Sequence, residues 1–513
     1  MTRTVVLGLD GASWRLLDPW IEAGELPNLA AFRAERAWAE TESCLPPVTF
    51  PNWKCYSAGK NPGKFGVYWF ERVDLAAGTI EVTNGGDFQT AELWDYLNDA
   101  GQRTGVVNMP TMYPPREIEG PIVCGGPDAV EGEYRSIEGG YATPADLEAE
   151  LEERFDYRVH PDPLLSSNDE RGTEVDAILD LLETRLEVAV TLLEERDLDF
   201  VHVTLFYLNV LQHFFWNDEP TRRAYHLIDE WIGRLGDLED TNLVIMSDHG
   251  AGPTTTEFYV NEWLAEHGYQ ARTTSVDNVF QQVGLDRETA LSVAKRLGAV
   301  DLLARVVPER IQQLIPQRAG LKRGRKLEAI DLPKTQAVAS AQGPIYLVAD
   351  ADETVRENLI ADLRAVEDDT GPLFDGVYRG EDVYAGPYVE AGPEVVLDQR
   401  EGVHVNDGVG GGDVQTAPDR WAAENTRNGI FLAGGPDFEA AGKLPQVSIM
   451  DIAPTILHAH GCAIPTDVDG EPLGIVRGDR AVETREPITG VRSTEDRTTG
   501  DVEDRLTQLG YME

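Results

Sequence analysis

Two short polar motifs follow apolar runs and carry residue types that bind divalent cations in proteins. Asp248 and His249 come at the end of the run at residues 243–247 and precede a glycine turn, and Asp10 follows the run at residues 4–9. A carboxylate and an imidazole beside such a turn can hold one divalent ion together. The alternatives are a simple polar turn at Asp248 and a helix cap at Asp10.

Thr49 adds a hydroxyl group in the proline-rich motif PPVTFPNW at residues 46–53. The prolines end one segment and open a helix, which places the hydroxyl at a helix N-terminus. Backbone N–H groups and the helix dipole attract phosphate at that position. A helix cap is again the alternative. The case for chemistry therefore rests on the combination of Asp10, Thr49, Asp248 and His249.

The elements that must position these side chains are predicted strands. Short apolar runs recur along the chain, and all but the last follow a helix-period segment such as residues 176–194; the runs lie at residues 4–9, 104–108, 200–205, 242–246 and 429–433. This alternation predicts a mostly parallel sheet covered by helices on both faces, a three-layer α/β/α sandwich. Ligands bind such sheets beyond the carboxyl ends of the strands. That edge is predicted to carry Asp10, Asn209, His213, Asp248 and His249.

The 513 residues are too many for one hydrophobic core. We predict a core whose first part is residues 1–253, interrupted by a helical cap at 254–333. The cap is rich in helix-period sequence and holds the one basic cluster of the chain. The core is expected to resume over residues 334–476, with strands near 334–338 and 344–348. Residues 477–513 are polar and acidic and are predicted to form a C-terminal tail.

The composition excludes several partners. Asp and Glu number 90 against 44 Lys and Arg, and the formal net charge is -46. Such a charge repels duplex nucleic acid and anionic membrane surfaces. Only 8 of the basic residues are lysine. An acidic, lysine-poor surface predicts a protein from a halophile, adapted to a salt-filled cytoplasm; an ordinary acidic protein is the alternative.

The cysteines and the hydropathy profile indicate the cellular compartment in which the protein is expected. The four cysteines form no CxxC pair and no dense framework, which favours a reducing environment. The N-terminal apolar run is too short for a signal peptide, and no window reaches the roughly 18 apolar residues of a membrane span. We therefore expect a cytoplasmic location with no membrane partner.

The ordered set of motifs resembles the alkaline phosphatase superfamily, and within it the type I phosphodiesterase/nucleotide pyrophosphatase branch. The motifs that carry the resemblance are VVLGLDG at 5–11, PPVTFPNW at 46–53, LNVLQHFFW at 208–216, VIMSDHGAG at 244–252, FYVNEWLAEHGY at 258–269 and RNGIFLAGGP at 427–436. The resemblance implies an alkaline phosphatase-like α/β fold. It also implies a metal-dependent hydrolase or phosphotransferase that acts on a small phosphorylated substrate, most readily a diester such as a nucleotide or sugar-nucleotide derivative.

By this resemblance, Asp10, Thr49, Asp248 and His249 match the ligands of one metal ion, with zinc or manganese expected. Thr49 matches the attacking residue. An ion beside the threonine oxygen lowers its proton affinity and neutralises the phosphate oxygen under attack. The resemblance then implies a covalent phosphothreonine that is hydrolysed or passed to an acceptor.

The sequence departs from the family pattern at the second metal site. The resemblance places Asn209, His213 and Asn425 where the family has an aspartate and two histidines, so only His213 is kept. Asparagine is a neutral oxygen ligand, so the two changes remove one negative charge and one imidazole. A further departure is Phe70, which stands where an asparagine usually holds the phosphate.

Three explanations of this departure compete. The enzyme runs on one metal ion, with His213 binding phosphate or shuttling a proton. A histidine from elsewhere, such as His404, completes a second site, which would give two ions per chain. Or the protein is catalytically degraded and binds a phosphorylated ligand without turnover. The one-metal enzyme is favoured, because the four residues around the nucleophile are all present.

Overall fold

The computed structural model of the chain describes residues 2–128, 139–162, 171–273, 326–348, 351–418 and 421–490, together with two short strands, Val130–Glu131 and Arg135–Ser136. Its largest element is a nine-stranded sheet in the order β24-β2-β23-β11-β1-β10-β5-β6-β9. The strands span Arg3–Gly8 (β1), Ala37–Glu42 (β2), Thr104–Val107 (β5), Ile122–Val123 (β6), Ala142–Thr143 (β9), Phe200–Thr204 (β10), Thr241–Met246 (β11), Asn428–Gly434 (β23) and Val447–Ser448 (β24).

The middle of this sheet is built from the apolar runs of the sequence. β5, β10, β1 and β11 are adjacent and parallel. They are buried along nearly their whole length, which is why they read as continuous apolar runs rather than alternating ones. The fifth predicted run became β23, which lies antiparallel to β11. The sheet is therefore mostly parallel, as predicted.

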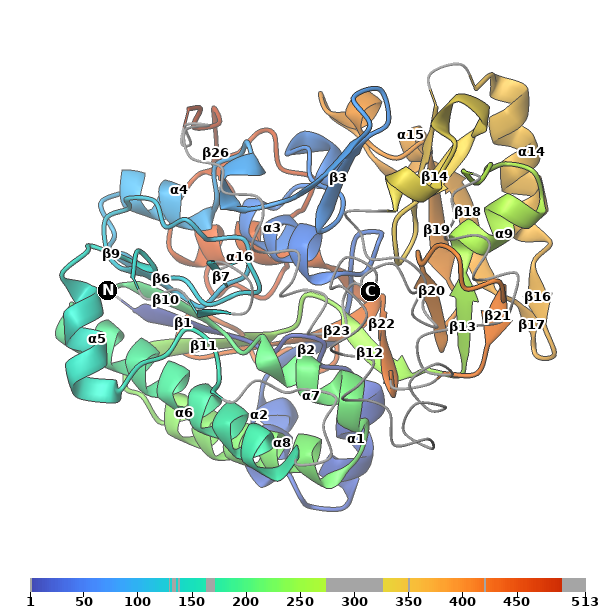
Figure 1. The fold of residues 1–513 in the computed structure, drawn as a ribbon. Coiled ribbons are helices and arrows are strands. Elements are labelled where there is room, and N and C mark those ends of the chain that lie inside the picture. Colours follow the sequence, from blue (N-terminus) through green and yellow to red (C-terminus); the bar gives the residue numbers. More distant parts are fainter. Residues whose placement is uncertain are drawn as a thin grey trace.

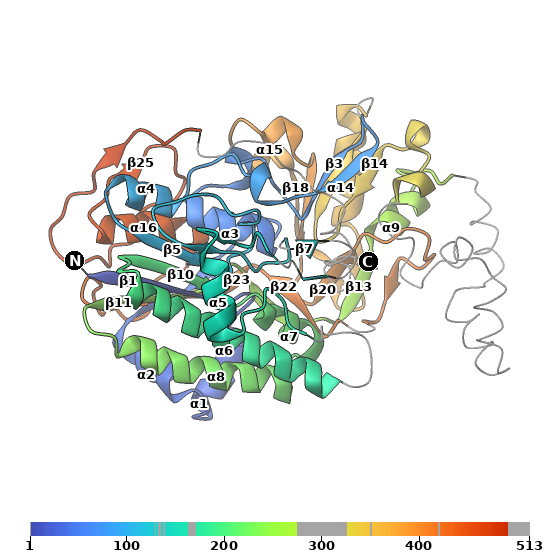
Figure 2. The ribbon, with the colours of Figure 1, turned by 60° about the vertical axis from the view of Figure 1, so that its left-hand side comes forward.

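Helices cover both faces of the sheet (Figures 1 and 2). One layer holds α1 (Trp14–Glu22), α2 (Pro27–Glu35), α6 (Arg171–Glu195) and α8 (Glu219–Gly236), and the other holds α3 (Thr49–Ala58), α4 (Leu93–Asp99) and α16 (Ile452–Ala459). The buried side of α8 includes Ala224, Ile228 and Ile232, whose helical spacing forms one apolar stripe. The three-layer α/β/α architecture is confirmed.

A smaller unit lies at one end of the sandwich (Figure 1). Its antiparallel sheet has the order β14-β15-β19-β18, and α14 packs on β18. The elements span Ala337–Ala339 (β14), Pro344–Leu347 (β15), Glu353–Arg364 (α14), Phe374–Arg379 (β18) and Val395–Gln399 (β19). Most of its buried apolar residues form a hydrophobic cluster separate from the main core. The strands predicted near 334–348 lie in this smaller sheet and not in the nine-stranded sheet. Apolar alternation identifies a strand but not its partner, and the core sheet resumes only at β23.

The predicted cap at 254–333 lies mostly outside the described residues. Its described ends hold the strand β13 (Thr256–Tyr259), the helix α9 (Val260–Glu266) and two short 3-10 turns at Leu327–Ala329 and Leu332–Lys334. β13 pairs in parallel with β20 (Val403–Asn406), so this part of the predicted cap belongs to a sheet.

The predicted tail is described only to residue 490. Within that part, β26 (Thr484–Arg485) pairs with β25 (Ile464–Pro465), and the Arg485 guanidinium donates to Asp99. Residues 477–490 are thus attached to the core. None of the helices in the described part of the chain has the length and apolar character needed to cross a bilayer.

Candidate active site

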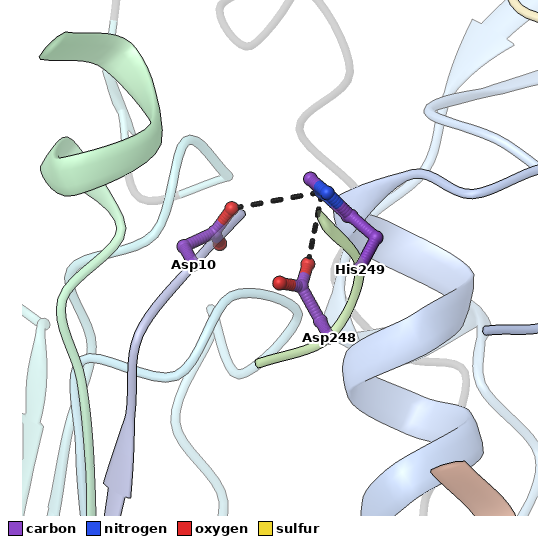
Figure 3. A group of neighbouring side chains, drawn as sticks. All are labelled: Asp10, Asp248 and His249. Atoms are coloured by element: carbon purple, nitrogen blue, oxygen red, sulfur yellow. Dashed lines mark ion pairs between the residues drawn. The ribbon is translucent and has the colours of Figure 1, made fainter. Parts of the chain in front are cut away.

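Four side chains meet at the carboxyl edge of the central strands, and Figure 3 shows three of them, Asp10, Asp248 and His249. Asp10 follows β1, and Asp248 and His249 follow β11; Gly8 of β1 and Met246 of β11 are register partners, so the two strands end side by side. Thr49 is the first residue of α3, which packs above this edge. All four residues are fully buried.

The polar atoms of these residues are close together. The Thr49 hydroxyl donates to Asp10 Oδ1 at 3.5 Å and lies 3.4 Å from His249 Nε2. His249 Nε2 lies 3.2 Å from Asp248 Oδ2 and 3.7 Å from Asp10 Oδ1. The structure therefore brings together the four residues that the sequence singled out.

Thr49 and Asp10 do not serve as helix caps, which was the alternative role for each. The N-cap of α3 is Val48, which makes no side-chain cap, and the Thr49 hydroxyl bonds to Asp10 instead. The N-cap of α1 is Ser13, three positions beyond Asp10. Both polar side chains are thus directed into the site rather than to a helix end.

Neighbouring groups hold each side chain in place. The Trp53 indole N–H donates to Asp10 Oδ2 at 2.9 Å, and the backbone N–H of Gly11 donates to Asp248 Oδ1 at 3.2 Å. His249 Nδ1 lies 2.8 Å from the carbonyl oxygen of Gly250. Because a carbonyl only accepts hydrogen bonds, Nδ1 carries the proton and Nε2 offers its lone pair to the site.

Asn52 fixes the loop that leads to Thr49. Its side-chain N–H groups donate to the carbonyl oxygens of Pro46 and Val48, each at 2.9 Å, and its side-chain oxygen accepts from the backbone N–H of Cys44 at 2.8 Å. The amide thus ties the loop before the helix to the first turn of α3. This role of Asn52 was not predicted, because it depends on the folded loop.

The electrostatics of the cluster fit a bound cation. Burial raises the pKa of Asp10 to about 8, and burial with the charge of Asp10 raises the pKa of Asp248. Burial lowers the pKa of His249 to about 3, so its imidazole is neutral, the form that binds metals. Asp248 Oδ2 has no hydrogen-bond donor among the described residues. Buried carboxylates without donors are costly unless they coordinate a metal.

The donor set matches a divalent ion. One ligand atom each from Asp10, Asp248 and His249 lies within 4.8 Å of the others. Two carboxylates and one imidazole suit zinc or manganese. Within the described parts of the chain, this is the one group of three or more histidine, cysteine, aspartate or glutamate side chains close enough to hold an ion.

The residues of the predicted second site also lie together. Asn209 and His213 are on α7 (Tyr207–Phe215), and Asn425 is on β22 (Ala423–Thr426). The Asn209 amide donates to the side-chain oxygen of Asn425 at 3.3 Å. His213 Nδ1 donates to the carbonyl oxygen of Ala423 at 2.7 Å, and burial lowers the pKa of His213 to about 4. This half of the site is therefore uncharged at neutral pH.

His404 is held by a buried glutamate that no sequence motif marks. His404 Nδ1 is paired with Glu424 Oε2, which also accepts from the Trp421 indole at 3.0 Å. Gln342 donates to Glu424 Oε1 at 2.7 Å. The Trp421 ring stacks on His213, with ring centroids 3.8 Å apart. His404 is thus joined to the second-site region through Glu424 and Trp421, outside any three-donor cluster in the described residues.

Phe70 lies in the apolar layer behind this site. Its ring is fully buried, with its centroid 4.3 Å from that of Phe50, the neighbour of Thr49 in α3. It supplies no polar atom to a phosphate.

Known proteins share this architecture. The model of a family described as type I phosphodiesterase / nucleotide pyrophosphatase matches residues 4–421. Among solved structures, phosphonoacetate hydrolase from Sinorhizobium meliloti 1021 in complex with phosphonoformate is similar, with a TM-score of 0.55 and 17% identity over 88% of this chain and 94% of that chain. No curated protein matches the chain in sequence.

Murine ectonucleotide pyrophosphatase / phosphodiesterase 5 is also similar, with a TM-score of 0.52 and 12% identity over 93% of this chain and 100% of that chain. An inactive variant of that murine protein has been solved in complex with AMP. At such low identities these likenesses establish the fold.

Proposed function

Because the chain belongs to the type I phosphodiesterase / nucleotide pyrophosphatase family, a family of phosphoester hydrolases, we propose that it hydrolyses or transfers a phosphoryl group with Thr49 as nucleophile. The substrate is a small phosphodiester such as a nucleotide or sugar-nucleotide derivative. The similar structures that contain phosphonoformate and AMP support a small phosphorylated ligand.

One observation carries the proposal. A threonine hydroxyl at the start of a buried helix lies 3.5 Å from Asp10 Oδ1 and 3.4 Å from His249 Nε2, beside a three-donor cation cluster. A buried hydroxyl needs one hydrogen-bond partner, whereas the Thr49 hydroxyl lies between the Asp10 carboxylate and the His249 imidazole. Acids placed together in a buried site raise each other's pKa, a cost that folded proteins accept mainly where chemistry requires it.

Asp10, Asp248 and His249 would hold one divalent ion, and Thr49 Oγ1 lies within reach of the same place. Such an ion supplies Lewis-acid chemistry, since it favours the alkoxide form of a threonine and neutralises charge on a phosphate. The site also supplies part of this stabilisation itself. The backbone N–H groups of Thr49 and Phe50 at the start of α3 have no carbonyl partner within the helix and can bind phosphate oxygens, whereas Pro51 has no N–H to offer.

The reaction we propose has two displacements. Thr49 Oγ forms a bond to phosphorus, the bond from phosphorus to the leaving oxygen breaks, and the leaving alcohol takes the proton of the Thr49 hydroxyl, so that Thr49 carries the phosphate with its remaining ester group. Water or another acceptor then attacks this phosphorus, the bond to Thr49 Oγ breaks, and Thr49 Oγ takes a proton from the attacking molecule. Asp10 orients the hydroxyl by accepting its hydrogen bond, and Trp53 holds the other Asp10 oxygen away from it.

His213 is the group that we assign to proton transfer or to phosphate binding on the far side of the site. Its Nδ1 is committed to the carbonyl of Ala423, so Nε2 is the atom that exchanges a proton. The neutral pair Asn209 and Asn425 replaces a charged second metal site and supports a one-ion enzyme. A carboxylate and an imidazole are missing from this place, and they are the ligands that attract a second ion.

Turnover of bis-p-nitrophenyl phosphate with added manganese or zinc, in high salt, tests the proposal. We expect Thr49→Ala to lower turnover by at least about 1000-fold, because the nucleophile is lost. Its free energy of unfolding should stay within about 1 kcal/mol of the wild type, because Thr49 is not a helix cap. Thr49→Ser keeps a hydroxyl at the same atom position and should retain measurable turnover.

Near-normal turnover in Thr49→Ala would refute the nucleophile assignment. A folded wild-type protein that binds manganese and a phosphorylated ligand but turns over no diester would instead identify a non-catalytic binding protein. Trapping of a phosphorylated protein after acid quench, with the phosphate mapped to Thr49, would support the covalent step.

A further inference from the structure

One buried amide joins the smaller unit to both halves of the candidate site. Gln342 lies at the tip of the hairpin that β14 and β15 form, and its side chain is almost fully buried. The side-chain N–H of Gln342 donates to Glu424 Oε1 at 2.7 Å, and its side-chain oxygen accepts from the Trp69 indole N–H at 3.3 Å. A residue of the smaller unit therefore contacts two segments outside its own sheet.

The backbone at this tip is strained. Gln342 has a φ of 58°, in the left-handed region that residues other than glycine, asparagine and aspartate rarely adopt. Its N–H donates to the carbonyl oxygen of Val405 at 2.9 Å. The next carbonyl, that of Gly343, accepts from the N–H of Leu397 at 3.0 Å. Strain of this kind persists where the surrounding structure enforces it, and it is concentrated at functional sites.

The two partners of Gln342 require different functions from its side chain. An ionised Glu424 carboxylate only accepts hydrogen bonds, and the Trp69 indole only donates them. A glutamine side chain offers a donor and an acceptor at the same end. A carboxylate or a hydrocarbon chain of the same length lacks at least one of the two functions, so the amide is specifically required here.

Glu424 extends this contact to His213. Its Oε1 also accepts from the backbone N–H of Asn425 at 2.7 Å, and its Oε2 accepts from the Trp421 indole at 3.0 Å. The Trp421 ring stacks on His213 with ring centroids 3.8 Å apart. His213 Nδ1 is bonded to the carbonyl oxygen of Ala423, the residue before Glu424, at 2.7 Å. The orientation of the His213 imidazole is thus set by two groups that Glu424 holds.

Trp69 extends the contact toward the proposed nucleophile. Its ring packs edge-on against that of Phe70, with centroids 5.4 Å apart. The Phe70 ring lies 4.3 Å from that of Phe50, which follows Thr49 in α3. The Gln342 amide therefore lies between the aromatic layer behind Thr49 and the polar network around His213.

We propose that Gln342 is a positioning residue whose amide fixes the orientation of the His213 imidazole relative to Thr49. The inference rests on the proposed function, in which Thr49 attacks phosphorus and His213 transfers a proton or binds the phosphate. Gln342 acts through Glu424 and Trp421 rather than on the substrate. Partners that orient a functional side chain from behind typically contribute about 10- to 100-fold to activity.

Gln342→Met tests the proposal, because methionine keeps the length of the side chain and removes both hydrogen bonds. We expect kcat for bis-p-nitrophenyl phosphate to fall about 10- to 100-fold. KM and the affinity for manganese should stay within about 2-fold, because the cluster of Asp10, Asp248 and His249 is unchanged. Gln342→Glu should lower kcat at least as much, since it places a second carboxylate beside Glu424.

A double-mutant cycle separates positioning from a general structural role. In a His213→Ala background, Gln342→Met should lower kcat by less than about 2-fold, because no imidazole is left to position. A merely structural contribution would lower kcat by the same factor in both backgrounds. That outcome would overturn the inference.

Ser340→Ala is the matched control, because Ser340 lies on the same hairpin and its hydroxyl donates to Glu71 Oε2 at 3.4 Å instead of to Glu424. This variant should keep a kcat within about 2-fold of the wild type.

A second measurement follows His213 itself, without turnover. In protein labelled with ¹⁵N-histidine, the ring signals of His213 are assigned by their absence in His213→Ala. They should shift in Gln342→Met and stay in place in Ser340→Ala, and unshifted signals in Gln342→Met would overturn the inference. If the wild type turns over no diester, the proposed function fails, while these signals still decide whether Gln342 positions His213.

Discussion

The side-chain amide of Asn209 donates to the side-chain oxygen of Asn425 at 3.3 Å, across 216 positions of sequence. Asn209 also hydrogen bonds to Asp10, which links this amide pair to the proposed cation site. The two asparagines are thus hydrogen bonded to each other directly beside the cluster of Asp10, Asp248 and His249. Restoring charged ligands at these two positions therefore tests how many ions the site can hold.

The first prediction concerns metal content. The wild type should bind about one divalent ion per chain, and Asn209→Asp with Asn425→His should raise this toward about two, because a carboxylate and an imidazole supply the charge and the strong ligand that a two-metal site needs. Metal analysis of dialysed protein measures the ratio. Asn209→Asp alone is the control, since it adds charge without the imidazole and should give an intermediate ratio. A wild type that already holds two ions contradicts the one-ion proposal.

The second prediction concerns Glu424, whose carboxylate joins His404, Trp421 and Gln342. Glu424→Gln removes a buried charge that accepts several hydrogen bonds, and the free energy of unfolding should fall by about 2–4 kcal/mol. Burial by itself raises the pKa of Glu424. The neighbouring His404 and its hydrogen bond outweigh burial, so the pKa of Glu424 is lowered overall. The stabilisation by the ionised Glu424 carboxylate is therefore fully present above the ordinary glutamate pKa. It is lost as the pH falls through the lowered pKa of Glu424 in the folded protein.

Chemical denaturation at neutral pH and at low pH measures this contribution. Glu390→Gln is the matched control, because Glu390 is exposed. An equal effect in both variants would mean that the contacts of Glu424 contribute nothing specific.

Much of the site was predictable, because the ends of the central strands can be predicted from the sequence. The runs that became β1 and β11 are adjacent parallel strands, so the polar residues after them had to meet at one edge, and Asp10, Asp248 and His249 do. The meeting of Asn209 with Asn425 was expected only from the family resemblance. Their elements, α7 and β22, are distant in sequence, and no local pattern specifies that contact.

The features that the sequence pattern could not predict are strand pairings and side-chain contacts between segments that are distant in sequence. β14 and β15 were recognised as strands, but they lie in one sheet with β19 and β18 rather than in the core sheet. Glu424 looked like one acidic residue among 90 Asp and Glu. Its role follows from burial beside His404, which arises only when β20 and β22 come together. Trp53 and Asn52 were read as motif residues, while the hydrogen bond of Trp53 to Asp10 and those of Asn52 to the loop before Thr49 form only in the folded α3.

The third prediction concerns ionic strength. With a net charge of -46, the folded state should weaken as salt is removed, because the Debye length grows from about 3 Å in 1 M salt to about 30 Å in 0.01 M. Circular dichroism melts should show a fall in Tm of at least about 5 °C, which at about 2.1 cal/mol/K per residue corresponds to roughly 5 kcal/mol for this chain. Sucrose without salt is the control, since it stabilises compact states without screening charge. A Tm that does not change with salt would argue against adaptation to high salt.

The last prediction concerns pH and metal affinity. Burial raises the pKa of Asp10 to about 8, so the metal-free site carries protons at pH 7 that an ion must displace. Manganese affinity should therefore rise as the pH passes through about 8, and calorimetry in buffers of different ionisation enthalpy should detect more proton release at pH 7 than at pH 9. The same raised pKa makes the metal-free fold lose stability as the pH rises from the ordinary aspartate value toward 8, because the unfolded chain releases that proton first. Asp10→Asn should remove this loss of stability while also weakening manganese binding. Proton release that is equal at pH 7 and pH 9 would show that the carboxylates are already ionised in the metal-free protein.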